Sequence, residues 1–100
     1  MTTWFVSRHP GAVEWACSQG LQVDRWQAHL DVSDIQPGDI VAGSLLANLA
    51  AEVCARGATY LHLALDVPAS LRGVELSLQQ MQESGARLTQ MHIEIVRPES

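Results

Sequence analysis

The sequence predicts an α/β fold, a single Rossmann-like domain of three layers over residues 1–100 with a mostly parallel five-stranded sheet. Two continuous apolar runs, residues 4–6 and 40–43, are typical of strands buried on both faces of a parallel sheet. Strand-like and helix-like segments alternate, and each of the three helix-like segments stops at a glycine before a strand. This alternation favours parallel strands joined by right-handed crossovers.

The first expected strand, residues 4–6, runs within about three residues into a helix. Pro10 suits the first helical position, because its fixed φ is already helical and its missing N–H costs nothing there. We expect this helix over residues 10–19, with Gly20 in the left-handed conformation just past its end. The unpaired N–H groups of its first turn would form an anion-binding site, with Arg8 and His9 beside it.

The middle of the chain supplies two more strands and a helix. Residues 23–30 alternate between apolar and polar, which indicates a strand at or near a sheet edge. Pro37-Gly38-Asp39 signals a turn, and the apolar run 40–43 follows as a central strand. Ser44 is then expected to cap a helix over residues 45–56.

The last third of the chain completes the sheet. A strand over residues 59–65 is followed by the longest irregular stretch. Ser77 and Gln80 have the spacing of a capping box for a third helix, which Gly85 ends. Residues 87–96 alternate as a last strand, and we expect a frayed tail after it, over residues 97–100.

Placing the apolar strands in the middle and the alternating strands nearer the edges gives the sheet order 2-1-3-4-5, in which either edge strand could run antiparallel. Ligands of open α/β sheets bind beyond the carboxyl ends of the strands, where the winding direction reverses. In this order the reversal lies between strands one and three. The loops 7–10 and 43–46 meet there, and the segment 72–75 leaves the same edge of the sheet. We therefore expect three loops to converge on one crevice.

Composition narrows the class of partner. The chain has no lysine, six arginines and a formal net charge of −5, so it lacks the basic surface on which duplex nucleic-acid binding depends. A few arginines at one site can still bind a compact phosphorylated ligand. No apolar run approaches the ~20 residues that span a bilayer, and no signal peptide is visible. We expect a cytoplasmic protein without membrane contact, in which Cys17 and Cys54 are buried thiols.

Arg8 and His9 are the sharpest candidates for chemistry: Arg8 to bind a phosphate, and His9 to donate or accept a proton near neutral pH. The alternative is that His9 only caps the first helix and Arg8 is a solvated surface residue. Ser44 and Asn48 could hydrogen-bond a ligand oxygen, although simple capping by Ser44 is an equal alternative.

Arg72 and Glu75 form either a second phosphate clamp or an exposed ion pair. His29, His62 and His92 fall on expected strands, where a satisfied or half-exposed histidine is the default. No spacing of potential ligands predicts a metal site, and we expect no cofactor. The sequence lacks the glycine motifs of dinucleotide-binding oxidoreductases, nucleoside triphosphatases and α/β-hydrolases.

Three blocks of sequence resemble a small CRISPR-associated accessory family of type III systems, one of the Csx group. These blocks are Trp-Phe-Val-Ser-Arg-His-Pro-Gly-Ala at residues 4–12, Gly-Ser-Leu with Asn-Leu-Ala-Ala-Glu-Val-Cys at 43–54, and Arg-Gly-Val-Glu-Leu at 72–76. Members of the group are similar to CARF-type domains, and some are ring nucleases. The resemblance implies a protein that acts on the cyclic oligoadenylate messengers of type III systems and cleaves cyclic tetra-adenylate, which switches off the nucleases that it activates.

The resemblance also implies a chemistry. A 3′–5′ RNA linkage is cleaved without a metal when the adjacent 2′-hydroxyl is aligned for attack, which leaves a 2′,3′-cyclic phosphate. Arg8 and His9 are then the catalytic candidates. The ligand-binding candidates are Ser7, Pro10, Gly11, Gly43, Ser44, Leu45, Asn48, Arg72, Gly73 and Glu75.

A ring of four identical nucleotides has internal symmetry, so we expect a homodimer whose two-fold axis matches it. Two other functions remain open at this point. One is a sensor that binds or sequesters the messenger without cutting it. The other is a subunit whose α/β domain only contacts other CRISPR proteins.

Overall fold

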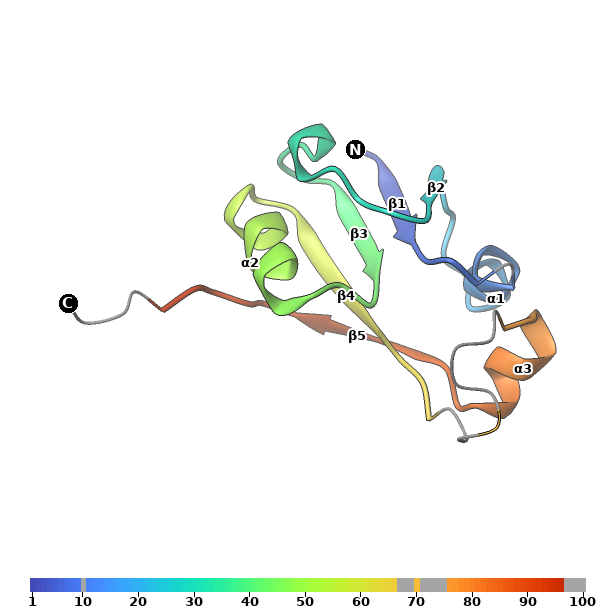
Figure 1. Cartoon of the computed structure of the whole chain (residues 1–100). Helices are drawn as coiled ribbons and strands as arrows, with labels where there is room; N and C mark the ends of the chain where they lie inside the picture. The colour runs from blue at the N-terminus through green and yellow to red at the C-terminus, as the bar shows by residue number, and fades with distance from the viewer. Residues whose placement is uncertain (10, 67–69, 71–75, 97–100) are drawn as a thin grey trace.

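A computed structural model of the chain describes residues 1–9, 11–66, 70 and 76–96. Its five strands form one sheet in the order β2-β1-β3-β4-β5, as predicted (Figure 1). In chain order the elements are β1 (Thr3–Val6), α1 (Ala12–Ser18), β2 (Arg25–Gln27), the 3-10 helix η1 (Val32–Asp34), β3 (Ile40–Gly43), α2 (Ala47–Ala55), β4 (Thr59–Ala64), α3 (Leu78–Glu83) and β5 (Arg87–Met91).

The first four strands of the sheet order are parallel, and the fifth is not. β1 lies between β2 and β3, with Val6 opposite Gln27 of β2 on one side and Gly43 of β3 on the other. β3 pairs parallel with β4, whereas β5 runs antiparallel to β4. Of the two edge strands whose direction was open, β2 is therefore parallel and β5 antiparallel, a common addition to a parallel sheet.

The core has two halves, one on each face of the sheet. Along β1 the side chains alternate, so that Trp4 packs on one face and Phe5 on the other. On the Trp4 face α2 covers the sheet through Ala50 and Val53. On the Phe5 face lie α1, with the fully buried Trp15, and α3 with Met81. The three-layer prediction is thus confirmed: apolar side chains on both faces of the central strands need a helix on each side.

Both alternating strands are shorter than the sequence predicted. We expected residues 23–30 and 87–96, and the structure has Arg25–Gln27 and Arg87–Met91. Each strand ends where its single neighbour ends. β2 pairs only with the four-residue β1, and β5 nears the beginning of β4 at Met91, which lies opposite Tyr60, the second residue of β4. Alternation therefore continues in the sequence beyond the point at which a partner strand exists.

The helices begin and end close to the predicted positions, with one wrong cap. The capping box of Ser77 and Gln80 is present at α3. Ser44 is not the N-cap of α2, because that position belongs to Leu46 and has no side-chain hydrogen bond. Within the described ranges, no helix is long and apolar enough to cross a membrane.

Two further expectations need correction. Cys54 is buried as expected, but Cys17 is exposed on α1. His29 and His92 follow the ends of β2 and β5 rather than lying on them, whereas His62 does lie on β4. The expected frayed tail falls outside the described residues.

Candidate functional site

A pocket of about 440 Å³ lies at the carboxyl ends of β1, β2 and β3, where the sheet order predicted a crevice. It brings together Arg8 and Ser44, which are 36 positions apart in the chain and come from different loops. Its lining residues are Val6, Ser7, Arg8, His9, Ala28, His29, Ser44 and Leu63.

Strand pairing places the loops that follow β1, β2 and β3 at the same edge of the sheet. Val6, the last residue of β1, lies opposite Gln27 and Gly43, the last residues of β2 and β3. The backbone N–H of Ser7 donates to the carbonyl of Gln27 across 3.0 Å, which extends the β1–β2 pairing by one residue. Arg8 and His29 each lie two residues beyond the ends of these neighbouring strands, which are about 4.8 Å apart. Both residues line the pocket.

His9 is held from two directions. Its backbone N–H donates to Ser7 Oγ at 3.1 Å, and its ring nitrogen Nδ1 accepts a hydrogen bond from the backbone N–H of Leu76 at 3.0 Å. A backbone amide can only donate, so Nδ1 must be the accepting nitrogen and the neutral ring carries its proton on Nε2. In the neutral ring His9 is therefore the tautomer that carries its proton on Nε2.

Ser44 contributes a hydroxyl that is already engaged on one side. Its Oγ donates to the backbone carbonyl of Leu63 across 2.6 Å, which ties the end of β3 to β4. Because the hydroxyl proton is used in this bond, the oxygen can offer only its lone pairs to a ligand. Ser44 can thus accept a hydrogen bond, for example from a ribose hydroxyl, without losing its structural role.

The turn that carries Ser44 is built around a buried tyrosine. The Tyr60 hydroxyl donates to the Gly43 carbonyl at 3.0 Å and accepts from the Leu45 backbone N–H at 3.1 Å. It also lies 2.8 Å from His62 Nδ1. Burial raises the pKa of Tyr60, so the phenol stays neutral and keeps the proton that this bond needs. Through these two hydrogen bonds Tyr60 holds the conformation of the turn from Gly43 to Leu45.

At two glycines the surrounding backbone leaves no space for a side chain. A Cβ on Gly43, whose φ is +145°, would collide with the Val6 carbonyl oxygen. A Cβ on Gly11 would collide with the backbone of Ser77 and Leu78, where α3 begins. Both were candidate ligand residues, and the geometry gives each a packing role.

The expected anion-binding site at the first helix is largely occupied. The Gly11 N–H donates to the Leu76 carbonyl, and the Ala12 N–H donates to the His9 carbonyl, both at 3.0 Å. An anion there would have to displace these bonds. The N-cap of α1 is Gly11, without a side-chain hydrogen bond, so the alternative that His9 caps this helix is wrong; only its backbone carbonyl accepts in the turn before the helix.

The remaining candidates divide into three groups. Ser7, Arg8, His9 and Ser44 line the pocket. Gly11, Gly43, Leu45 and Asn48 lie in the adjoining turns and helices and are not among its lining residues; Asn48 is exposed on α2, and Leu45 packs against the core beneath that helix. Pro10, Arg72, Gly73 and Glu75 lie outside the described residues.

His29 is the lining residue that sequence reasoning missed. Residues 23–30 alternate, and this pattern placed His29 within a strand as an ordinary half-exposed histidine. The structure ends β2 at Gln27, so His29 is a loop residue at the carboxyl end of a parallel strand. The usable signal was the length of the neighbour, because a four-residue β1 cannot pair with an eight-residue strand.

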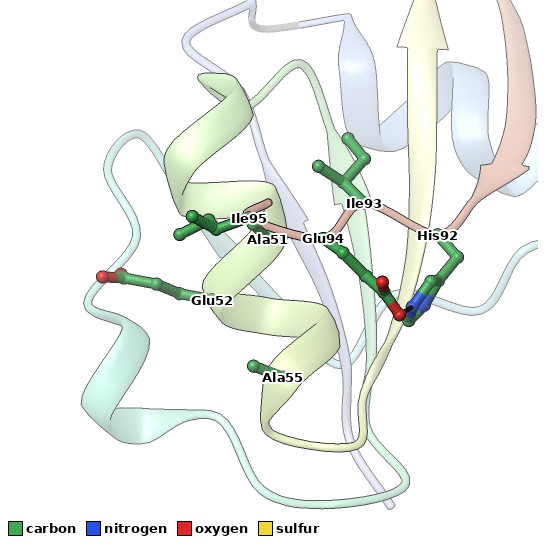
Figure 2. A pocket seen from close by; sticks show the side chains of 7 residues that line it. All are labelled: Ala51, Glu52, Ala55, His92, Ile93, Glu94 and Ile95. Atoms are coloured by element: carbon green, nitrogen blue, oxygen red, sulfur yellow. Dashed lines mark hydrogen bonds and ion pairs between the residues drawn. The ribbon is translucent and has the colours of Figure 1, made fainter. Parts of the chain in front are cut away.

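A second pocket, of about 370 Å³, has a different character. It lies between α2 and the chain after β5, and its lining includes Ala51, Ile93 and Ile95 together with Glu52 and Glu94 (Figure 2). His92 Nε2 lies 3.0 Å from Glu94 Oε1 at its rim. Two carboxylates in a lining without arginine or lysine would repel a phosphate, so this pocket does not suit an anion.

No group of three or more His, Cys, Asp or Glu side chains in the described part of the chain is arranged to hold a metal ion. Among the lining residues of the 440 Å³ pocket, Arg8 supplies the fixed charge, and that charge is positive. The pocket therefore combines a guanidinium, two imidazoles and two hydroxyls, a set suited to an anionic ligand with hydroxyl groups.

Comparison with known proteins identifies the family. No curated protein and no solved structure matched the chain. A family model described as "Putative CRISPR-associated protein (Cas_VVA1548)" matches residues 4–94, a span that includes every described residue of the pocket. The chain belongs to this family of CRISPR-associated proteins.

Proposed function

We propose that this protein is a ring nuclease that degrades a cyclic oligoadenylate messenger, cyclic tetra-adenylate in the first instance, and so switches off type III CRISPR signalling. The observation that carries the proposal is the meeting of Arg8, His9 and Ser44 around one pocket at the carboxyl ends of the central strands. Membership in a CRISPR-associated family supports the class of ligand.

The proposed reaction is an in-line attack of a ribose 2′-hydroxyl on the adjacent phosphate. The 2′-oxygen bonds to phosphorus as the 5′-oxygen leaves, which yields a linear product with a 2′,3′-cyclic phosphate. Arg8 binds the non-bridging oxygens, on which negative charge increases in the transition state. His9 donates from Nε2 to a phosphate oxygen, and Ser44 accepts from a ribose hydroxyl and orients it.

We further propose that the active form is a homodimer. A volume of about 440 Å³ suits part of a four-nucleotide ring rather than the whole ligand. Two pockets related by a two-fold axis would match the internal symmetry of the ring. Light scattering with and without cyclic tetra-adenylate measures the assembly directly, and a monomer under both conditions would contradict a dimer.

Incubation of the purified protein with radiolabelled cyclic tetra-adenylate in EDTA tests the function. Linear products support the ring nuclease. Tight binding with an intact ring would instead favour a messenger-sequestering protein, and neither binding nor cleavage would favour a subunit that only contacts other proteins.

Arg8→Ala is the matching variant, because Arg8 is exposed and its loss should leave folding intact. We expect it to weaken binding by at least about tenfold, the loss of one charge-assisted bidentate contact. Arg56→Ala is the control, since Arg56 is also exposed but lies at the end of α2 and does not line the pocket. Equal binding by the two variants would remove Arg8 from the site.

A further inference from the structure

We propose that His29 is the general base of the site, the group that takes the proton from the attacking 2′-hydroxyl. This inference rests on the proposed ring nuclease function and adds to it a catalytic residue on the loop that follows β2. It follows from which nitrogen atoms around the pocket can accept a proton.

His9 cannot take that proton as it is held. Its Nδ1 lone pair accepts the Leu76 backbone N–H at 3.0 Å, and its Nε2 carries the ring proton. Neither nitrogen of the neutral ring offers a lone pair to a hydroxyl. The same arrangement makes His9 a good donor to a phosphate oxygen, which is a different role.

The other polar side chains of the lining are equally unsuited. Arg8 stays protonated, since a guanidinium does not lose its proton in proteins. The Ser44 hydroxyl donates to Leu63, and the Ser7 hydroxyl accepts from the His9 backbone; neither serine is basic enough to remove a proton from a ribose hydroxyl. No carboxylate lines the pocket among the residues that the structure describes.

His29 meets the requirement that these groups fail. Its side chain is exposed, lines the pocket, and is not hydrogen-bonded to any residue in the described ranges. A neutral imidazole with an available lone pair accepts a proton near neutral pH. Because Val6 lies opposite Gln27, the loop of His29 leaves the sheet beside the loop of Arg8, which binds the phosphate under attack.

The proton balance of the step is complete. His29 receives the 2′-hydroxyl proton as the 2′-oxygen bonds to phosphorus and the bond from phosphorus to the 5′-oxygen breaks. The 5′-oxygen takes a proton from water as it leaves. No oxidant, metal or other co-reactant is required.

The test measures single-turnover cleavage of cyclic tetra-adenylate in EDTA by His29→Ala and by the wild type. We expect the variant to be slower by about 10²- to 10⁴-fold, the range of a lost general base. Added imidazole should restore part of the rate, because it fits the space of the missing ring. His92→Ala is the control, since His92 is also an exposed loop histidine but lies at the other pocket, and we expect it to cleave at the wild-type rate.

A modified substrate separates base from acid. With sulfur in place of the 5′-bridging oxygen the leaving group needs no proton, so a missing acid no longer matters, whereas a missing base still does. We expect His29→Ala to remain slow on this substrate relative to the wild type. Recovery of the wild-type rate would make His29 the acid and overturn the assignment.

The outcomes distinguish this inference from the function on which it rests. Cleavage by the wild type together with an equal rate for His29→Ala would refute the role of His29 and leave the ring nuclease intact. Failure of the wild type to cleave, with the ring recovered whole, would refute both.

Discussion

The backbone N–H of Leu76 donates a hydrogen bond to Nδ1 of His9 across 3.0 Å, although 67 positions separate the two residues in the chain. This bond joins the loop after β1 to the approach to α3, and it decides what the imidazole can do. The Gly11 N–H, bonded to the Leu76 carbonyl at 3.0 Å, holds the same segment from the other side. His9 is therefore positioned by the Phe5 face of the molecule, the face on which α1 and α3 pack.

Because His9 carries its ring proton on Nε2, we expect His9→Gln to retain more activity than His9→Ala. In His9→Gln the new side-chain amide places an N–H close to where the imidazole presents Nε2–H, whereas alanine offers no donor. We expect His9→Ala to lower the single-turnover rate by about 10²- to 10³-fold, the cost of one lost donor to a developing oxyanion, and His9→Gln to lower it much less. If both variants are equally slow while urea unfolding shows both folded, donation from Nε2 is not the role of His9.

Ser44 is predicted to contribute to stability as well as to the site. Ser44→Ala leaves the Leu63 carbonyl without its 2.6 Å donor, and we expect the free energy of unfolding to fall by about 1 kcal/mol. Ser18→Ala is the matched control: its Oγ makes a bond of the same length, but to the Trp15 carbonyl one turn earlier in the same helix. Urea titration measures both. A larger loss for Ser18→Ala would show that the link between β3 and β4 adds little.

Gly11 tests how closely α1 and α3 must approach. Its φ of −81° suits any residue, so Gly11→Ala changes only the space available, and the new Cβ would meet the backbone of Ser77 and Leu78. We expect a loss of about 1–3 kcal/mol in the free energy of unfolding, typical of overpacking. Because Leu76 directly precedes the displaced residues, the ¹⁵N NMR signal of His9 Nδ1 should also shift.

Gly20→Ala is the comparison for that prediction. It places a residue at φ +85°, yet nothing lies within 4 Å of the new Cβ, so backbone strain alone is tested. We expect it to be destabilising without moving the His9 signal. An unchanged His9 signal in Gly11→Ala as well would show that the start of α3 does not position the imidazole.

The sheet order was predictable because a continuous apolar run identifies a strand that is buried on both faces of the sheet. Phe5 and Val41 are fully buried in central strands, and their apolar neighbours made the runs that identified these strands. The meeting of Arg8 with Ser44 then followed from topology, since parallel strands share the edge at which their carboxyl ends lie.

The features that the sequence did not predict are set by contacts with residues far away in the chain. Strand length is set by the neighbouring strand, so His29 was placed in β2 and its entry into the pocket was missed. The hydroxyl of Ser44 could either cap the following helix or bond to the neighbouring strand, and only the position of Leu63 decides between the two. The tautomer of His9 likewise depends on Leu76, which no local pattern connects to it.

Asp39 predicts how stability depends on pH. This carboxylate is 3% exposed at the amino end of β3, at the opposite end of the sheet from the pocket. Burial acts to raise its pKa, but hydrogen bonds from the backbone N–H groups of Gln36 and Thr2 and from the Trp4 indole N–H outweigh burial, and the pKa lies below 3.8. A lowered folded-state pKa means that the charged form stabilises the fold.

The sign of the effect follows from that direction. The contribution of Asp39 is complete above the unfolded-state pKa, near pH 4, and is lost as the pH falls through the lower folded-state value. In Asp39→Asn one oxygen becomes an NH₂ that faces at least one of the three donors, so we expect a loss of about 1–3 kcal/mol at pH 7. The difference from the wild type should narrow as the pH falls below 4, because the unfolded wild-type carboxyl takes up a proton more readily than the folded one and the contribution of the charge is lost. Urea unfolding of the wild type and Asp39→Asn at pH 7 and pH 3 measures this difference in stability. Asp34→Asn is the control, because Asp34 is exposed. If the difference between the wild type and Asp39→Asn is the same at both pH values, the charge on Asp39 does not stabilise the fold.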